Sequence, residues 1–214
     1  MWELSNEGSV RTLTLKDPNT LNALSPTIID ELIEHLLQAD MNPTVRVLII
    51  TGVGNAFTSG MNLGALSNSQ TPQYKRMLED SVPRMFDTFV DFSKPLLMAV
   101  NGLGTSFGAT SAFWFLPSGK WMDAQQCKEA GLALEVVSED EVMEETMRRT
   151  QALATSPSHA IIEAKNLMRA TSRGPMKDAN HAEMGIFRDL LKHPALGEGI
   201  AAIKEWRAPD FSAF

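Results

Sequence analysis

An apolar run from Val45 to Thr51 is followed at once by two glycines, Gly52 and Gly54. Apart from Arg46, the run consists of Val, Leu, Ile and Thr, which is typical of a strand buried on both faces. A small-residue turn after such a strand can present bare backbone N–H groups to a ligand. We therefore expect the segment 45–63 to form a buried strand followed by a turn that contacts a ligand.

A second unit of the same kind follows later in the chain. Residues Pro95 to Val100 are apolar, and the turn after them, from Asn101 to Gly108, consists mostly of small residues. Two strands that end in turns with accessible amides make a candidate oxyanion hole, in which backbone N–H groups bind an anionic oxygen.

The segments around these strands alternate in type. Residues Val10 to Leu15 alternate apolar and polar side chains, which predicts a half-exposed strand. Residues Pro26 to Gln38 predict a helix with Ser25 as its N-cap, and Tyr74 to Phe92 predict another, which Pro83 should kink or restart. Strand, helix and strand in this order predict an α/β architecture. The predicted inward-facing residues are Ile28, Ile29, Leu32, Ile33, Leu36 and Leu37 in the first helix, and Met77, Met85, Phe86 and Phe89 in the second.

The second half of the chain is predicted to be mostly helical. Residues 123–130 predict a helix with a capping aspartate, and 132–137 predict a short strand. Helices are predicted for most of the chain beyond Ser138. We therefore divide the chain into an α/β core at 1–137 and a helical region at 138–214. Exposed apolar stripes in the helical region favour packing on a neighbouring subunit.

Composition excludes several classes of function. The net charge of −7 disfavours a nucleic-acid partner, because such binding depends on neutralising phosphates. No apolar run approaches the roughly 20 residues that span a bilayer, so no membrane partner is expected. The single cysteine, Cys127, fits a reducing compartment and is expected to be buried and inert. Because neither a secretory pattern nor a peroxisomal signal is visible, the expected location is cytoplasmic.

One short motif suggests a different chemistry. Gly104 to Gly108 matches the G-x-S-x-G pattern of serine hydrolases, with Ser106 as the nucleophile and three histidines downstream. No HGGG-type segment precedes it, so we keep a serine hydrolase only as an alternative. The four histidines and one cysteine show no zinc-binding pattern, and no metal site is expected.

Five segments carry motifs in a recognisable order: Asn22-Ala23-Leu24, Val45 to Leu63, Lys94 to Gly108, Met122 to Val137, and Gly197 to Phe211. Together they cover nearly the whole chain and resemble the enoyl-CoA hydratase/isomerase (crotonase) family. The resemblance implies a spiral of ββα units with a helical C-terminal region, assembled as homotrimers or hexamers. It also implies an acyl-CoA thioester as substrate and no further cofactor.

The same resemblance implies which residues form the site. The catalytic groups would be the backbone N–H groups of Met61 and Phe107, which would bind the enolate oxygen of the thioester. Removing one such donor typically lowers the rate by roughly 10²–10³. The residues implied to contact the substrate are Ala23, Leu24, Phe57, Ser59, Gly60, Asn62, Leu63, Gly108 and Thr110.

The sequence departs from the family pattern after the second turn. Hydratases of the family carry a glutamate where this chain has Thr110, and the isomerase branch instead uses a later glutamate. No glutamate lies between Glu79 and Glu129, and a segment near 110–116 is missing relative to the family. The resemblance therefore implies an isomerase that converts 3-enoyl-CoA to 2-enoyl-CoA. The alternatives are a hydratase or another reaction of this fold, and a non-catalytic acyl-CoA-binding protein.

Two explanations are open for the missing segment. Either a flexible segment near Thr110 to Phe113 is left out of the 214-residue sequence, or the protein is a shortened variant that cannot transfer a proton. We favour the first, because deleting a strand and a helix from a core costs more than a typical stability of about 5–15 kcal/mol.

Overall fold

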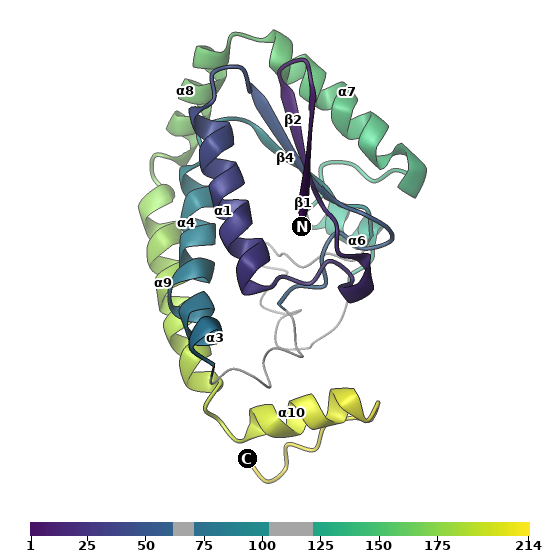
Figure 1. The fold of residues 1–214 in the computed structure, drawn as a ribbon, viewed down its shortest axis with the longest axis vertical. Coiled ribbons are helices and arrows are strands. Elements are labelled where there is room, and N and C mark those ends of the chain that lie inside the picture. The colour runs from purple at the N-terminus through teal and green to yellow at the C-terminus, as the bar shows by residue number, and fades with distance from the viewer. Residues whose placement is uncertain (62–70, 103–121) are drawn as a thin grey trace. The chain divides into compact units, whose positions relative to one another are not determined.

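Strand β3 (Val47–Gly52) lies in the interior of the sheet, and all six of its residues are buried. The computed structural model describes residues 1–61, 71–102 and 122–214 (Figure 1). The buried strand predicted at 45–51 is therefore confirmed, with its start two residues later. Its aliphatic side chains fit this place, because an interior parallel strand needs apolar cover on both faces.

The four described strands form one sheet in the order β1-β2-β3-β4. β2 (Val10–Leu15) and β4 (Leu96–Ala99) both pair with β3 in parallel, and β1 (Trp2–Glu7) pairs antiparallel with β2. The three parallel strands therefore end at the same edge of the sheet. In open α/β sheets, ligands bind outside the carboxyl ends of the strands.

Strand β1 has no predicted counterpart, because five of its six residues are exposed and most are polar. It forms through pairing with β2 and not through an apolar pattern of its own. The prediction that β2 is half-exposed is wrong. Val10 and Thr12 are buried on one face, and Leu13 and Leu15 are buried on the other.

One compact unit comprises Met1–Leu24, Met41–Met61 and Lys94–Glu163. Its apolar core joins the sheet to helix α7 (Val142–Thr155), which follows a 3-10 turn, η3 (Glu139–Glu141). Burying each large aliphatic side chain here stabilises the fold by about 1.5–3 kcal/mol. The residues packed together are Val10, Val47, Ile49, Leu97 and Ala99 from the sheet, and Val142, Met143, Met147, Leu153 and Ala154 from α7.

The segment 132–137 forms no strand, so the short strand predicted there is wrong. None of the described strands pairs with it, and a strand needs a paired neighbour to satisfy its backbone. The helix predicted before it is confirmed as α6 (Ala124–Glu129), with a capping box between Asp123 and Gln126. Cys127 on this short helix is half-buried, which corrects the prediction of a buried thiol.

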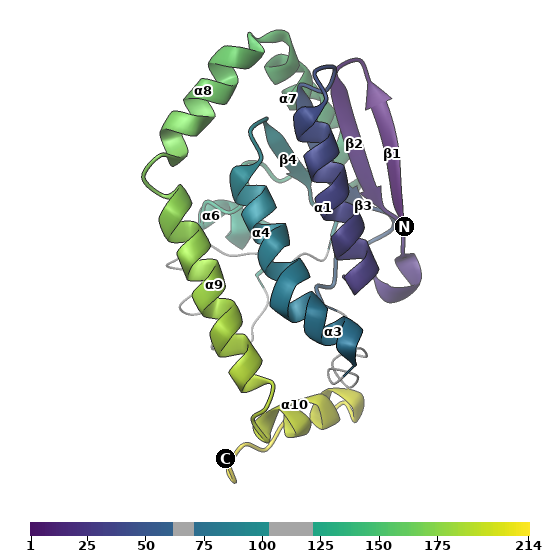
Figure 2. The same ribbon diagram turned by 60° about the vertical axis from the view of Figure 1, so that its left-hand side comes forward.

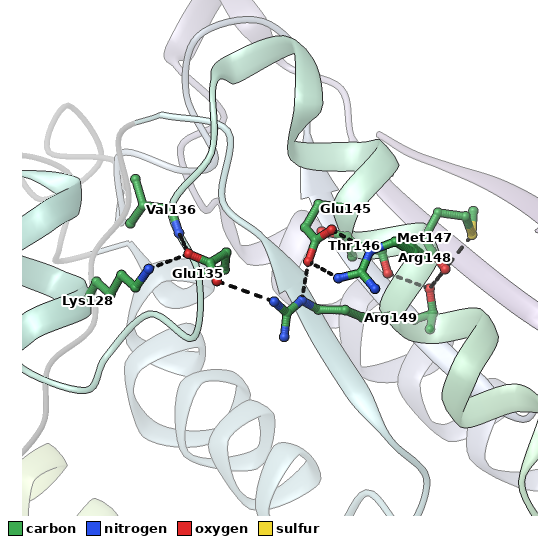
Figure 3. A network of polar contacts seen from close by, with 9 residues as sticks. Lys128, Glu135, Val136, Glu145, Thr146, Met147, Arg148 and Arg149 are labelled. Carbon is green, nitrogen blue, oxygen red and sulfur yellow. Dashed lines mark hydrogen bonds and ion pairs between the residues drawn. The ribbon is translucent and has the colours of Figure 1, made fainter.

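The 132–137 segment is held by ion pairs and not by hydrogen bonds to a neighbouring strand (Figure 3). The Glu135 carboxylate pairs with Lys128 of α6 and, at 3.5 Å, with Arg149 of α7. Arg149 also donates from Nε to Glu145 at 2.5 Å. Hydrogen bonds from Arg148 and Arg149 lower the pKa of Glu145 to about 2. The network therefore links α6, the irregular segment and α7 at any pH near neutrality.

Arg46, the one charge in the predicted strand, lies just before β3 and is half-buried. Its Nε donates to the Ser158 hydroxyl at 2.7 Å, and its guanidinium also donates to the Ser156 carbonyl. Ser158 begins helix α8 (Ser158–Arg169). The charge thus anchors the corner between α7 and α8 beside the start of β3.

The second compact unit comprises Ser25–Asp40, Asn62–Ser93 and Ala164–Phe214. Helix α1 (Pro26–Met41) begins as predicted, with the Ser25 hydroxyl accepting from the Ile28 N–H at 3.3 Å. Five of the six predicted inward residues are buried, namely Ile28, Ile29, Leu32, Ile33 and Leu36. Leu37 is exposed and its prediction is wrong, because in the last turns of the helix the buried face continues through Leu36 and Ala39 instead.

The helix predicted at 74–92 is divided into three parts. They are α3 (Pro72–Arg76), a π-helical turn, η2 (Met77–Ser81), and α4 (Val82–Asp91). The helix does not restart at Pro83, because the backbone stays helical through Ser81 and Val82; the proline follows the π-helical turn and lies in the first turn of α4. Met77 and Met85 are buried as predicted, whereas Phe86 is 45% exposed, which corrects its inward placement.

Helix α9 (Arg173–Leu190) runs beside α4 in both views (Figures 1 and 2). Asp91 at the end of α4 accepts from Arg173 at 2.8 Å and from Lys177 at 2.5 Å. The Asn180 side chain donates to the Pro83 carbonyl at 3.2 Å. Polar contacts thus hold α4 and α9 together at both ends of α4. The last helix, α10 (Ala195–Lys204), completes the mostly helical second half that was predicted.

Lys165 on α8 has the most strongly lowered lysine pKa among the described residues. Its ammonium lies 5.2 Å from the centroid of the Phe92 ring. Burial, and after it the positive charge of Arg169, lowers the pKa of Lys165 to about 8. The folded protein therefore binds fewer protons than the unfolded chain between about pH 8 and 10.5. The Lys165 contribution to stability accordingly rises with pH across that window.

We expect Lys165→Met to stabilise the protein at pH 7 by roughly 1 kcal/mol, since it removes the desolvation of a charged amine in a partly exposed site. The gain should shrink as the pH rises through the window. Guanidinium unfolding of both proteins at pH 7 and pH 10 measures the difference. Lys192→Met, at an exposed lysine paired with Asp189, is the control and should show no such trend. An equal gain at both pH values would contradict this account.

None of the helices in the described ranges is both long and apolar enough to cross a bilayer. The division of the chain into an α/β core at 1–137 and a helical region at 138–214 stays a prediction.

Candidate functional site

The first turn begins where β3 ends, at Gly52. A Cβ atom on Gly52 would lie 2.6 Å from the carbonyl oxygens of both Ala56 and Phe57. No real side chain tolerates such contacts with backbone, so only glycine allows the chain to fold back tightly here. The turn from 52 to 57 is therefore closed on itself at the carboxyl edge of the sheet.

Asn22 braces this turn from the loop after β2. Its side chain is fully buried, and its backbone is left-handed, with φ of 56°. The Nδ2 group donates to the Val53 carbonyl at 3.0 Å and to the Ala56 carbonyl at 2.6 Å. The Oδ1 atom accepts from the Asp17 N–H at 2.9 Å. One side chain thus joins the loop before α1 to the turn after β3.

The segment after the turn runs alongside residues 21–24. The Ser59 N–H donates to the Leu21 carbonyl at 2.9 Å, and the Leu24 N–H donates to the Gly60 carbonyl at 2.8 Å. Leu24 and Met61 form a parallel β-bridge. Residues that are far apart in the sequence are therefore held here as neighbouring extended chains.

This pairing fixes the direction of the Met61 N–H group. The Gly60–Met61 peptide is trans, so its carbonyl and its N–H point in opposite directions. Because the Gly60 carbonyl points at Leu24, the Met61 N–H points away from Leu24. A backbone donor with a fixed direction can stabilise negative charge that develops on a bound ligand, without reorganising during the reaction.

The second turn is tied to the first by Asn101. Its Oδ1 atom accepts from the Gly52 N–H at 3.3 Å, and its Nδ2 group donates to the Gly54 carbonyl at 2.7 Å. The Thr51 hydroxyl also donates to the Ala99 carbonyl at 2.9 Å. Gly102 has φ of 132°, and a side chain there would strike the Asn55 carbonyl. The ends of β3 and β4 are thus locked side by side.

The structure brings together the site residues predicted on two short segments. Leu24, Phe57, Ser59, Gly60 and Met61 are half-buried, as expected of groups near a ligand. Ala23 is buried. The other predicted site residues lie outside the described residues, namely Asn62, Leu63, Phe107, Gly108 and Thr110, and so does Ser106.

Three residues that brace the site were not predicted from the sequence. Asn22, Thr58 and Asn101 hold its turns by hydrogen bonds from side chain to backbone. The two asparagines could have been predicted as bracing residues from their places next to turns, because asparagine is enriched in left-handed backbone and bonds readily to nearby main chain. Within the described ranges, no three His, Cys, Asp or Glu side chains are grouped so that they could hold a metal ion.

Comparison with protein families and curated proteins gives one family. The family described as Enoyl-CoA hydratase/isomerase matches the chain over residues 5–114 and 106–213. The 2,3-dehydroadipyl-CoA hydratase of Escherichia coli is 25% identical, over 97% of this chain and 97% of that protein. The 1,2-epoxyphenylacetyl-CoA isomerase of the same organism is 24% identical, over 96% of each. These alignments span 250 and 252 positions, so tens of positions in the relatives have no counterpart in the 214 residues here.

Solved structures agree on the fold. A carnitinyl-CoA hydratase from Mycobacterium avium superposes with a TM-score of 0.83 at 19% identity, covering 100% of this chain and 98% of that one. The predicted crotonase-like α/β fold is therefore confirmed.

Proposed function

The chain belongs to the enoyl-CoA hydratase/isomerase family, and we propose that it binds an acyl-CoA thioester and stabilises the enolate of that thioester with backbone amides. The observation that supports this most is the fixed Met61 N–H, which points away from Leu24 at the carboxyl edge of the sheet. The Phe107 N–H would be the second donor. The enolate oxygen needs such donors because removing a proton from C2 places negative charge on it.

Among reactions through an enolate, we propose isomerisation of 3-enoyl-CoA to 2-enoyl-CoA. A proton leaves C2, the double bond moves from C3–C4 to C2–C3, and a proton is delivered to C4. Hydration instead needs a group that activates water, and Thr110 stands where hydratases of the family carry a glutamate. Hydratase activity is therefore the alternative reaction at the same site.

A non-catalytic acyl-CoA-binding protein is the second candidate function. It is favoured by the absence of any glutamate between Glu79 and Glu129, because the glutamate of the isomerase branch would lie between the second turn and Met122. The family match also breaks where its two stretches overlap, at residues 106–114. In this alternative, the amides bind the thioester and no proton moves.

Mass and activity measurements on the purified protein separate these possibilities. Peptide mapping by mass spectrometry across residues 109–117 would show whether the chain has an additional segment there, because the peptide that spans these residues would then differ from the one that the 214-residue sequence predicts. The protein is then assayed with 3-enoyl-CoA and 2-enoyl-CoA substrates, and acyl-CoA binding is measured by calorimetry. Formation of 2-enoyl-CoA supports the isomerase, hydration alone supports the hydratase, and binding without turnover supports the second candidate. Absence of binding would overturn the proposal.

Assembly as a homotrimer or hexamer, a cytoplasmic location and the lack of a further cofactor stay predictions. Sedimentation analysis of the purified protein tests the first. Imaging of the tagged full chain tests the second. Activity after exhaustive dialysis against a chelator tests the third.

A further inference from the structure

Thr58 lies between the turn and the Met61 donor and is buried. Its hydroxyl donates to the Asn22 carbonyl at 2.7 Å and accepts from the Gly60 N–H at 3.1 Å. A hydroxyl has one proton to donate, so both contacts form together with a single orientation. Among the described residues, the Thr58 hydroxyl bonds to these two backbone groups. It is therefore better suited to holding the backbone than to contacting a ligand.

The two contacts act on the residue whose conformation directs the donor. Gly60 has φ of 83°, in a region where glycine moves freely and other residues are strained. The peptide before Gly60 is held through its N–H by Thr58. The peptide after Gly60 is held through its carbonyl by Leu24, at 2.8 Å. With both flanking peptide planes fixed, the flexible glycine cannot swing the Met61 N–H out of line.

We propose that Thr58 is a positioning residue for the oxyanion donor of Met61. The inference rests on the proposed function, because it assigns Thr58 a part in stabilising the thioester enolate. Thr58 acts through Gly60 and does not touch the substrate. An interaction that positions a donor for the transition state lowers kcat when it is lost, and leaves substrate binding nearly unchanged.

A matched pair of substitutions tests the hydroxyl. Thr58→Val keeps the shape of the side chain and removes both contacts, whereas Thr58→Ser keeps the hydroxyl. We expect Thr58→Val to lower kcat by about 5- to 10-fold with KM within about twofold, as the loss of a net hydrogen bond predicts. Thr58→Ser should restore most of kcat. Ile49→Val in the buried core destabilises the fold without touching this segment, and it controls for general loss of stability.

Amide hydrogen exchange gives a readout that does not depend on turnover. In Thr58→Val, the Gly60 amide loses its acceptor and should exchange about 5- to 10-fold faster than in the wild type, and in Thr58→Ser it should not. Unchanged exchange of the Gly60 amide, or a Thr58→Val enzyme with wild-type kcat below its melting temperature, would overturn the inference. If the wild type lacks activity on every acyl-CoA substrate, the proposed function fails while the exchange measurement still decides the role of Thr58.

Discussion

Replacing Met61 with proline is expected to lower kcat on 3-enoyl-CoA by roughly 10²–10³-fold, because proline has no N–H and removes one oxyanion donor. The bridge between Leu24 and Met61 uses the Gly60 carbonyl as its acceptor, so this contact survives the substitution. KM should change little, since a developing enolate oxygen is bound more strongly than the carbonyl of the ground state. Steady-state kinetics on the purified variant measure both constants.

Met61→Ala is the matched control, because it removes the side chain and keeps the N–H. It should retain kcat within a few-fold of the wild type. Circular dichroism and thermal melting of both variants establish that they are folded. If Met61→Pro is folded and as active as the wild type, the Met61 amide is not the donor. If both variants lose activity equally, the side chain matters and the backbone assignment fails.

Asn22→Ala is expected to lower the free energy of unfolding by roughly 3–5 kcal/mol, a large fraction of a typical domain's stability. The variant leaves the Val53 and Ala56 carbonyls and the Asp17 N–H without their partner in a fully buried place. Alanine at φ of 56° is also strained, whereas asparagine tolerates left-handed backbone. Denaturant unfolding followed by fluorescence and circular dichroism measures the loss.

Asn22→Gly separates these two effects. Glycine adopts left-handed backbone without strain, so its loss of stability reports mainly the missing hydrogen bonds. We expect the glycine variant to be more stable than the alanine variant by about 1 kcal/mol, and both to be far less stable than the wild type. A loss below about 1 kcal/mol in both variants would show that water or local rearrangement replaces the asparagine.

The strands and turns of the site were readable from the sequence because their signals are local. The run before Gly52 has few polar groups, so it can only be buried. The small residues after it mark the turn that the structure shows at residues 52–57. Helix ends were equally local, as Ser25 and Asp123 show by capping the helices that follow them.

Elements that depend on pairing with a distant segment of the chain could not be predicted from local patterns. Strand β1 is polar and exists because β2 pairs with it. Residues 132–137 have the composition of a strand but find no described strand to pair with, and ion pairs hold them instead. In both cases backbone hydrogen bonding across the chain, and not side-chain pattern, decides the structure.

The family resemblance, the two apolar strands and the turn after the first of them could be predicted from the sequence, and Met61 was proposed as a donor from that resemblance. The contacts that hold the proposed Met61 donor became visible only in the folded chain. Asn22 and Thr58 reach carbonyl and N–H groups of segments that are distant in the chain, or that fold back on themselves. Such contacts leave no periodic trace in a sequence, because each depends on one polar group meeting one backbone atom after the chain has folded.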